Sequence, residues 1–599
     1  MCGIIGYVGE DAALPVLTGG LDRLSYRGYD SAGIALLDDD GLQPYRAPGK
    51  LEALRAVLPE SAAATIGMGH TRWSTHGPPT VANAHPQLDC SGEIAVVHNG
   101  VISNAAALRA ELEGHTVTSE TDTELIAHLL EEARTAGGTP TAQIRGVTDQ
   151  LEGSFALVIA FADDSHLYAV RQQSPLVIGD GPRGRYIASD VPAFIEHTDA
   201  VRYLEDGDIA VVGADAVTVM NGDGPVARPV TRVEWDPEVA EKGGFAHYML
   251  KEIIEQPDAM RQSLSGRSDP ATGTVHFESE LGALEQVRTV VLVGCGTSHY
   301  AASYAASVYE ANGIAAEAVI ASEFRERPRW DPSDTLMIAV TQSGETADTL
   351  TAMRAAEGQG YPTMAVTNTV GSSITRLADH SVFIRAGPEI GVAATKTFST
   401  QVATLLLFGV ALGEARGSLS RTARRRQLEA IDGLPGQLQA MLDARAVIDE
   451  IAAMAASASN HVFIGRALGL PVAQEGALKL KEISYDHAEA FPAGELKHGP
   501  LALVTDETVV YALLTPGADP ERTVTNVKEV QARGATVVAI GPPAHWRTLT
   551  EWGVPVEGSA TTAPLLSTLA LQLIAYEIAA AAGRDIDQPR NLAKSVTVE

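Results

Sequence analysis

The sequence predicts a multidomain protein of mixed α/β and α+β class. An amino-terminal domain of stacked β-sheets with helices precedes two doubly wound parallel α/β domains. With 599 residues, the chain is too long for one hydrophobic core, because domains usually contain ~100–200 residues. Short apolar runs broken by turns fill residues 1–235, whereas from Val287 onward apolar runs alternate with longer helical segments. The second pattern occurs twice, which indicates two similar domains.

The amino-terminal runs include CGIIGYVG, AGIALL, EIAVVHNG and FALVIAFA. Closely spaced runs of this kind are typical of packed β-sheets. One amphipathic helix is predicted over residues 121–137, because Leu125, Ile126, Leu129 and Leu130 fall on one face.

The later runs are TVVLVG, TLMIAV, TMAVTN and SVFI and, after a helical stretch near 400–455, HVFIG, TVVYALL and TVVAIG. Continuous apolar strands between helices indicate parallel sheets that are covered on both faces. We therefore expect domains at 1–240, 247–430 and 431–583, with a polar linker at 236–246 and an irregular tail at 584–599.

The net charge of −31 argues against a nucleic-acid partner, because the phosphate backbone repels an acidic surface. The chain has three cysteines. A small and odd number of cysteines argues against a disulfide framework and favours a reducing compartment.

No signal peptide is predicted, so the cytoplasm is the default location. The apolar run at 402–412 is shorter than the ~20 residues of a membrane helix. Residues 564–582 are long enough but contain Ser567, Gln572 and Glu577, so we expect a core helix and no membrane association.

Cys2 follows the initiator methionine directly. Removal of that methionine would leave a free α-amine beside a thiol, a pair that can attack an amide carbon. Three further segments suit such chemistry. In HTRWSTHG, Arg72 can hold a carboxylate. In HNG, Asn99 and Gly100 can form an oxyanion hole. In SETDTE, Asp122 can meet an ammonium group.

Together with MCGIIGY and YRGYDSAG, these segments resemble the N-terminal-nucleophile glutamine amidotransferases. The resemblance implies that Cys2 is the nucleophile, that Asn99 and Gly100 form the oxyanion hole, and that glutamine is recognised by Arg72, Thr75, His76 and Asp122. Cys90 matches no functional motif and is interpreted as structural.

Two strands end in small, hydroxyl-rich turns, GCGTS (294–298) and TQSGETADT (341–349). Such turns present backbone N–H groups and hydroxyls to an anion at the carboxyl ends of parallel strands. Neither fits a dinucleotide or nucleoside-triphosphate motif.

A helix is predicted over residues 475–491. Its charged residues Glu475, Lys479, Glu482 and Asp486 share a face, either as a solvated ion-pair stripe or as a proton-transfer group held near lysine. Lys594 has the composition of an ordinary exposed lysine in the tail.

The turns, EGALKLKEISY, AGELKHGPLAL and the ending DQPRNLAKSVTVE resemble the sugar-isomerase domains of the glutamine–fructose-6-phosphate aminotransferase family. The resemblance implies that His498, from a neighbouring subunit in one arrangement, opens the sugar ring, that Lys594 forms a Schiff base with the ketose, and that Glu482 moves the C1–C2 proton, with the tail completing the site. It also implies a sugar-phosphate site formed by Thr297, Ser298, Thr341, Gln342, Ser343, Thr346 and Val392. Thr341 departs from the family's usual SQSGE but keeps the hydroxyl.

The expected reaction takes ammonia from glutamine and uses it to convert fructose 6-phosphate into glucosamine 6-phosphate, the first step of amino-sugar synthesis. Ammonia must avoid solvent, so an internal channel is expected, with Trp73 as its gate. No metal or other cofactor is expected, and the resemblance suggests a homodimer through the sugar-isomerase domains.

Three alternatives stay open at this point. An amidotransferase acting on phosphoribosyl pyrophosphate would need an acidic phosphoribosyl motif after a strand, and none is found. A non-catalytic sugar-phosphate sensor would not need Cys2, Glu482 and Lys594 together. An amidotransferase for another ketose phosphate is not distinguished by the sequence.

Overall fold

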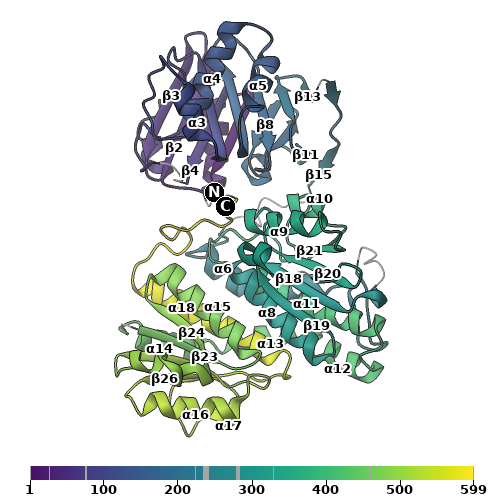
Figure 1. Ribbon diagram of the computed structural model, residues 1–599. Helices are drawn as coiled ribbons and strands as arrows, with labels where there is room; N and C mark the ends of the chain where they lie inside the picture. The colour runs from purple at the N-terminus through teal and green to yellow at the C-terminus, as the bar shows by residue number, and fades with distance from the viewer. Residues whose placement is uncertain are drawn as a thin grey trace. The chain divides into compact units, whose positions relative to one another are not determined.

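The computed structural model describes residues 2–25, 27–73, 77–222, 224–233, 242–277, 284–327, 330–458 and 460–597. The chain forms two compact units, Met1–Glu241 with Ala593–Glu599, and Lys242–Leu592. Figure 1 draws most of the first unit in purple to blue and the second in teal to yellow. The predicted linker at 236–246 falls largely outside the described residues.

The first unit contains two antiparallel sheets. The eight-stranded sheet has the order β15-β11-β9-β10-β1-β4-β2-β3 and the seven-stranded sheet the order β14-β13-β12-β8-β7-β6-β5. The strands of the first sheet are β1 (Gly3–Gly9), β2 (Ser31–Asp38), β3 (Gly41–Pro48), β4 (Ile66–Arg72), β9 (Val177–Gly181), β10 (Gly184–Ala188), β11 (Ala200–Tyr203) and β15 (Val230–Arg232). Those of the second are β5 (Gln87–Leu88), β6 (Ile94–Ile102), β7 (Gly153–Phe161), β8 (Leu167–Gln172), β12 (Ile209–Val212), β13 (Val217–Asn221) and β14 (Gly224–Val226).

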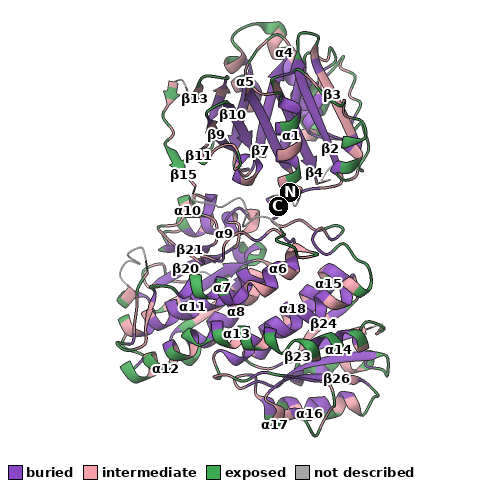
Figure 2. Cartoon of the chain, turned by 180° about the vertical axis from the view of Figure 1, so that it is seen from behind, coloured by how far each residue is buried: buried purple, intermediate pink, exposed green. Residues whose placement is uncertain are grey.

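The two sheets stack face to face between layers of helices. Alternate residues of a strand face opposite sides, so Ile5 of β1 packs in the core beside α1, whereas Ile4 packs in the core between the sheets. Leu157 of β7 faces the helices on the other side. Figure 2 shows the strands of this unit as mostly buried. The helices are α1 (Ala13–Arg23), α2 (Leu51–Arg55), α3 (Ala105–Glu111), α4 (Thr123–Ala136), α5 (Pro140–Thr148) and the 3-10 turn Val191–Phe194.

The second unit contains two five-stranded parallel sheets, β19-β18-β20-β21-β22 and β24-β23-β25-β26-β27. The first has strands β18 (Thr289–Gly294), β19 (Ala315–Ile320), β20 (Thr335–Val340), β21 (Thr363–Thr367) and β22 (His380–Phe383), and the second β23 (Asn460–Gly465), β24 (Ala488–Pro492), β25 (Thr508–Leu513), β26 (Thr536–Gly541) and β27 (Gly553–Pro555). Two short strands, β16 (Ser268–Asp269) and β17 (Thr274–Val275), precede β18 in the sequence. The predicted fold class is confirmed in both units.

Helices cover these sheets, and one continuous core joins them. Leu292 of β18, Leu480 of α15 and Leu569 of α18 all belong to it, while Val291 of β18 faces a separate cluster on the α9 side. The helices are α6 (Tyr248–Ile254), α7 (Gln256–Leu264), α8 (Gly296–Ala311), α9 (Ala347–Glu357), α10 (Ser373–Leu377), α11 (Lys396–Ala415), α12 (Arg421–Asp432), α13 (Leu434–Asp443), α14 (Ala446–Ala455), α15 (Gly469–Ser484), α16 (Pro520–Gln531), α17 (Pro543–Trp546) and α18 (Ala563–Ala581). The 3-10 turns are Leu284–Gln286, Ala321–Glu326, η5 (Ala493–His498) and Pro500–Leu503.

Helices α11 and α18 are long and apolar enough to cross a membrane by length and composition alone. Their most apolar windows are 83% and 89% buried inside the unit, which is the behaviour of core helices. The core helix predicted at 564–582 agrees with this, whereas the run at 402–412 proves to be the middle of a longer helix.

The helix predicted over residues 475–491 is observed over Gly469–Ser484, so it begins and ends earlier than expected. α15 ends at Ser484, because Tyr485 takes the left-handed conformation with φ 69°, and β24 begins at Ala488. Asp486 therefore lies beyond the helix and does not continue its charged face. The left-handed residue stops the helical hydrogen bonding. A left-handed helix end is usually recognised in a sequence by a glycine, and the residue here is a tyrosine, so the end could not be predicted.

Candidate active sites

Cys2 lies at the start of β1, where this strand pairs with the end of β4. Gly3 is opposite Thr71 in that pairing, so the thiol reaches the residue that follows β4. The backbone N–H of Trp73 donates to Cys2 Sγ at 3.2 Å. Burial raises the pKa of the Cys2 thiol, while the hydrogen bond from Trp73 works in the opposite direction. Deprotonation therefore needs a nearby base.

Asn99 of β6 reaches Cys2 from the facing sheet. Its Nδ2 donates to the Cys2 carbonyl at 2.8 Å, and its side chain is buried. The orientation of this amide is set by His70, a residue that sequence reasoning missed. His70 Nε2 lies 2.9 Å from the His98 carbonyl and 3.1 Å from Asn99 Oδ1.

The carbonyl of His98 can only accept, so His70 Nε2 carries the proton and also donates to Asn99 Oδ1. That contact turns Nδ2 of Asn99 toward Cys2. Burial lowers the pKa of His70 to about 3, so the ring is neutral near pH 7.

Gly100 follows Asn99 in β6 and has a φ of 134°. A Cβ at this position would lie 1.9 Å from the Ser154 carbonyl oxygen of β7. Only glycine fits so close to the neighbouring strand.

Asp122 precedes α4 and is buried. Its Oδ2 accepts from the Ile102 N–H at 2.9 Å, which ties the carboxylate to the end of β6. Arg72 ends β4, and its guanidinium donates to the Gly77 carbonyl at 3.3 Å. Burial lowers the pKa of Arg72, and the charge of Asp122 is among those that oppose this shift. Thr75 and His76 lie outside the described residues.

In the second unit, the two hydroxyl-rich turns occupy the carboxyl ends of β18 and β20. Ser298 Oγ accepts from Gln401 Nε2 at 3.1 Å, and Ser343 Oγ accepts from the Glu345 N–H at 3.1 Å. Thr341 Oγ1 accepts from the Gly344 N–H at 3.2 Å, which closes the second turn.

Of the remaining predicted phosphate-site residues, Gln342 and Thr346 belong to the second turn, whereas Val392 contacts a different segment. The Gln342 carbonyl accepts from the Asn368 N–H at 3.1 Å, and Thr346 is the residue before α9. Val392 is buried, and its N–H donates to the Asp587 carbonyl at 3.2 Å.

Thr297, from the first parallel domain, contacts the charged face of α15 in the second. Its Oγ1 donates to Glu475 Oε1 at 3.2 Å and accepts from Lys479 Nζ at 3.2 Å. Lys479 Nζ also lies 2.7 Å from Glu482 Oε2 and 3.4 Å from Glu475 Oε1. Glu475 and Lys479 are fully buried, so this face is an internal charge network rather than a solvated stripe.

The two carboxylates differ in surroundings. Burial raises the pKa of Glu475 to about 7, although the nearby Lys479 ammonium opposes this shift. Burial alone would lower the pKa of Lys479, but Glu475 and Glu482 together raise it. Lys479 is therefore a fixed cation, and Glu482 is the partly exposed carboxylate beside it.

His498 is exposed at the end of η5. Lys594 is half-buried and groups with the first unit. Four residues earlier, the Arg590 N–H donates to the Tyr485 hydroxyl at 2.8 Å, and its guanidinium lies 4.3 Å from the Tyr485 ring centre. Arg590 thus fixes the tail to Tyr485, the residue directly after α15.

Comparison with known families agrees with this division. A glutamine amidotransferase domain matches residues 70–196, and a SIS domain matches residues 283–411 and 454–582. The glutamine–fructose-6-phosphate aminotransferase (isomerising) of Halobacterium salinarum is 49% identical over 603 residues and covers all of both chains. The chain belongs to the glutamine–fructose-6-phosphate aminotransferase family.

Another member of this family, from Thermus thermophilus, is 44% identical over 607 residues and again covers all of both chains. Among solved structures, the C-terminal domain of the Francisella tularensis aminotransferase is 35% identical, with a TM-score of 0.55. It covers 58% of this chain and all of that domain. The aminotransferase resemblance inferred from the motifs is therefore confirmed.

Proposed function

We propose that this chain converts fructose 6-phosphate and glutamine into glucosamine 6-phosphate and glutamate. Full-length similarity to aminotransferases of that name supports the reaction. The observation that carries the glutamine half is the arrangement around Cys2, where Asn99 Nδ2 lies 2.8 Å from the Cys2 carbonyl and the Trp73 N–H donates to Sγ.

In the glutamine half, Cys2 Sγ attacks the side-chain amide carbon and its proton passes to the α-amine, directly or through water. Asn99 Nδ2 and the Gly100 N–H stabilise the oxyanion. The C–N bond then breaks, ammonia leaves with the transferred proton, and water hydrolyses the thioester to glutamate. Arg72 and Asp122, with Thr75 and His76, hold the carboxylate and ammonium groups of the substrate.

In the sugar half, the turns containing Ser298, Gln342 and Ser343 hold the phosphate, together with Thr297, Thr341, Thr346 and Val392. His498 opens the ring, and Lys594 forms an imine with the C2 carbonyl, releasing water. Ammonia displaces the lysine at C2, and Glu482 moves a proton from C1 to C2. The Lys479 ammonium lies 2.7 Å from Glu482 Oε2, so it holds this carboxyl group in place beside the proposed substrate.

The domain boundaries proposed are 1–240, 247–430 and 431–583, with 584–599 completing the sugar site. Ammonia passes internally, with Trp73 as the gate. A homodimer through the sugar-isomerase domains fits the exposed position of His498. In such a dimer, the His498 of each copy would act on the substrate bound to the other copy. Cys2, Cys90 and Cys295 form no disulfide bond, which favours a reducing, cytoplasmic location. Nucleic-acid and membrane partners are not part of the proposal.

Incubation of the full chain with glutamine and fructose 6-phosphate tests the reaction. Glutamate and glucosamine 6-phosphate should form in equal amounts. Cys2→Ala should abolish both products, because no nucleophile remains, while fructose 6-phosphate binding measured by calorimetry persists. Ser61→Ala, at an exposed position of the same unit, is the control and should retain both products. Glutamate without an amino sugar would exclude the proposed acceptor, and an active Cys2→Ala variant would exclude the nucleophile.

A further inference from the structure

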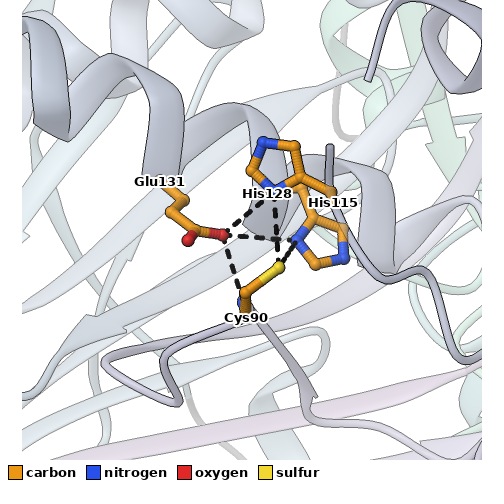
Figure 3. A group of neighbouring side chains, drawn as sticks. All are labelled: Cys90, His115, His128 and Glu131. Carbon is orange, nitrogen blue, oxygen red and sulfur yellow. Dashed lines mark hydrogen bonds and ion pairs between the residues drawn. The ribbon is translucent and has the colours of Figure 1, made fainter. Parts of the chain in front are cut away.

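Four side chains of the first unit that take no part in the glutamine chemistry converge on one point (Figure 3). They are Cys90, His115, His128 and Glu131, and each offers one ligand atom, all within 4.8 Å of one another. Cys90 lies in the turn after β5, His115 in the segment between α3 and α4, and the other two on α4. Residues three apart on a helix share a face, so His128 and Glu131 point the same way.

The spacing of the ligand atoms is that of a tetrahedral metal site. Cys90 Sγ lies 3.4 Å from His115 Nδ1 and 3.6 Å from His128 Nδ1. Glu131 Oε2 lies 3.2 Å and 3.5 Å from the same two nitrogens. Zinc–ligand bonds of ~2.0–2.3 Å at tetrahedral angles place neighbouring ligands about 3.3–3.6 Å apart. The four measured separations fall in or close to that range.

The second nitrogen of each histidine faces a carboxylate. His115 Nε2 lies 3.3 Å from Glu132 Oε1, whereas His128 Nε2 lies 3.7 Å from Glu124 Oε1 and makes no hydrogen bond to it. Metal-bound histidines characteristically direct their other ring nitrogen to a carboxylate, which fixes the ring and the tautomer. This pattern leaves both Nδ1 atoms as the inward, metal-facing donors.

The backbone around the site is also organised. The Cys90 N–H donates to Glu131 Oε2 at 3.1 Å, and the side chain of Asp89 accepts from the Ile94 N–H at 2.9 Å, which holds the turn.

In their metal-binding forms, one thiolate and one carboxylate with two neutral imidazoles carry a charge of −2, which a divalent cation neutralises.

We infer that Cys90, His115, His128 and Glu131 form a structural zinc site in the glutamine amidotransferase domain. Four protein ligands leave no open position, as in structural rather than catalytic zinc sites. One thiolate and two imidazoles favour Zn²⁺ over hard cations such as Mg²⁺ or Ca²⁺. The proposed site gives Cys90, which the sequence analysis interpreted as structural, a specific structural role, and it differs from the expectation that no metal is bound.

The ion would link the turn after β5 and the segment before α4 to α4 itself. That helix begins directly after Asp122, so the site steadies the element that positions a proposed glutamine-binding carboxylate. Its role is positional, because none of its ligands belongs to the group of residues around Cys2.

Metal analysis of the full chain tests the inference, with any affinity tag removed because tags bind zinc. After equilibration with Zn²⁺ and desalting, the wild type should retain about one zinc per chain by elemental analysis. Cys90→Ser should retain at least tenfold less. Cys295→Ser, which alters a thiol in the other unit, should retain the full amount. Zinc below a tenth per chain in the wild type, or equal zinc in Cys90→Ser, would overturn the site.

Substitution with Co²⁺ gives a second readout, in which the wild-type spectrum alone tests the site without relying on the folding of any variant. A tetrahedral thiolate site should give intense visible bands and a near-ultraviolet sulfur-to-cobalt charge-transfer band in the wild type. Cys295→Ser should keep the charge-transfer band, and Cys90→Ser should lose it. A wild-type spectrum with only the weak bands of octahedral cobalt would contradict the assignment.

Discussion

At the scale of single residues, His70 decides which way the Asn99 amide points. His70 Nε2 lies 3.1 Å from Asn99 Oδ1, and without this donor only the Cys2 carbonyl, which accepts from Nδ2 at 2.8 Å, would hold the amide. Asn99 would then present its nitrogen to the developing oxyanion in a less well fixed position. The glutamine reaction thus depends on a buried imidazole that does not itself touch the thiol.

We predict that His70→Leu lowers kcat for glutamine hydrolysis by about tenfold to a hundredfold, somewhat less than deletion of an oxyanion donor itself. KM for glutamine should change little, because Arg72 and Asp122 stay in place. His70→Gln, which keeps an N–H donor, should recover much of the loss. Steady-state glutaminase kinetics distinguish these variants, and an unchanged kcat in His70→Leu would remove the residue from this role.

The same histidine makes stability depend on pH. Its pKa falls from 6.5 to about 3 in the folded chain because it is buried. Between these values the unfolded chain binds a proton that the folded chain does not, so stability rises with pH. The contribution is complete above pH 6.5 and is lost as the pH falls toward 3.

We therefore expect the free energy of unfolding to decrease as the pH falls below 6.5, by at most about 5 kcal/mol from His70. Denaturant unfolding between pH 7 and pH 4, followed by tryptophan fluorescence, measures this slope. The slope should be shallower in His70→Gln, since the substituted amide does not titrate. Equal slopes in both proteins would assign the pH dependence to other buried groups, such as His85, whose pKa burial also lowers.

Motifs indicated Cys2, Asn99 and Trp73, and the structure places both Asn99 and Trp73 in contact with Cys2, while their roles in the reaction stay predictions. His70 could not be predicted, because its partner Asn99 comes from a strand of the other sheet. The zinc ligands were missed for a similar reason. Only the pair His128 and Glu131 has a local spacing, and Cys90 is a single cysteine without a motif.

At the scale of elements, the turn after β20 depends on Gly344. Its φ is 71°, and a Cβ there would lie 2.1 Å from Ser372 Oγ. The residue also donates its N–H to Thr341 Oγ1 at 3.2 Å, so it fixes the shape of the proposed phosphate turn.

Gly344→Ala should raise the Kd for fructose 6-phosphate at least tenfold, because the turn must open to admit the methyl group. Gly360→Ala is the matched control. It has a similar φ of 80° but open space around it, so it should cost ~1 kcal/mol of stability and leave binding intact. Calorimetry with fructose 6-phosphate measures both effects. Equal Kd values for the two variants would show that the turn tolerates side-chain crowding.

Strands with two buried faces were predictable as continuous apolar runs, and β18, β20 and β25 are fully or almost fully buried. Strands β19 and β24 were not predicted as strands. They lie at the edges of their sheets and are only partly buried, so selection for apolar side chains is weak there. The early end of α15 at Ser484 escaped prediction because it depends on the backbone of Tyr485 rather than on composition.

At the scale of the whole molecule, the carboxyl-terminal tail is the segment whose function is hardest to see in composition. Arg590 is bound to Tyr485 at the end of α15, whereas residues 593–599 group with the amino-terminal unit. Lys594 follows Arg590 by four residues, so its Cα lies within ~14 Å of that of Arg590. A fixed tail with a half-buried lysine differs from the frayed terminus that composition suggests.

Lys594 should carry the imine of the sugar reaction. An exposed lysine is almost fully protonated near pH 7, so imine formation requires desolvation or a neighbouring cation to supply the neutral amine. Lys594→Arg keeps the charge but forms no imine, and it should abolish glucosamine 6-phosphate synthesis while fructose 6-phosphate binding changes less than about threefold.

Borohydride reduction with fructose 6-phosphate present should attach the sugar to the peptide containing Lys594 in the wild type only. Labelling of Lys479 instead would transfer the role to α15, although its ion pairs with Glu475 and Glu482 hold that amine in the protonated form. An active, unlabelled Lys594→Arg variant would reduce Lys594 to a structural residue of the tail.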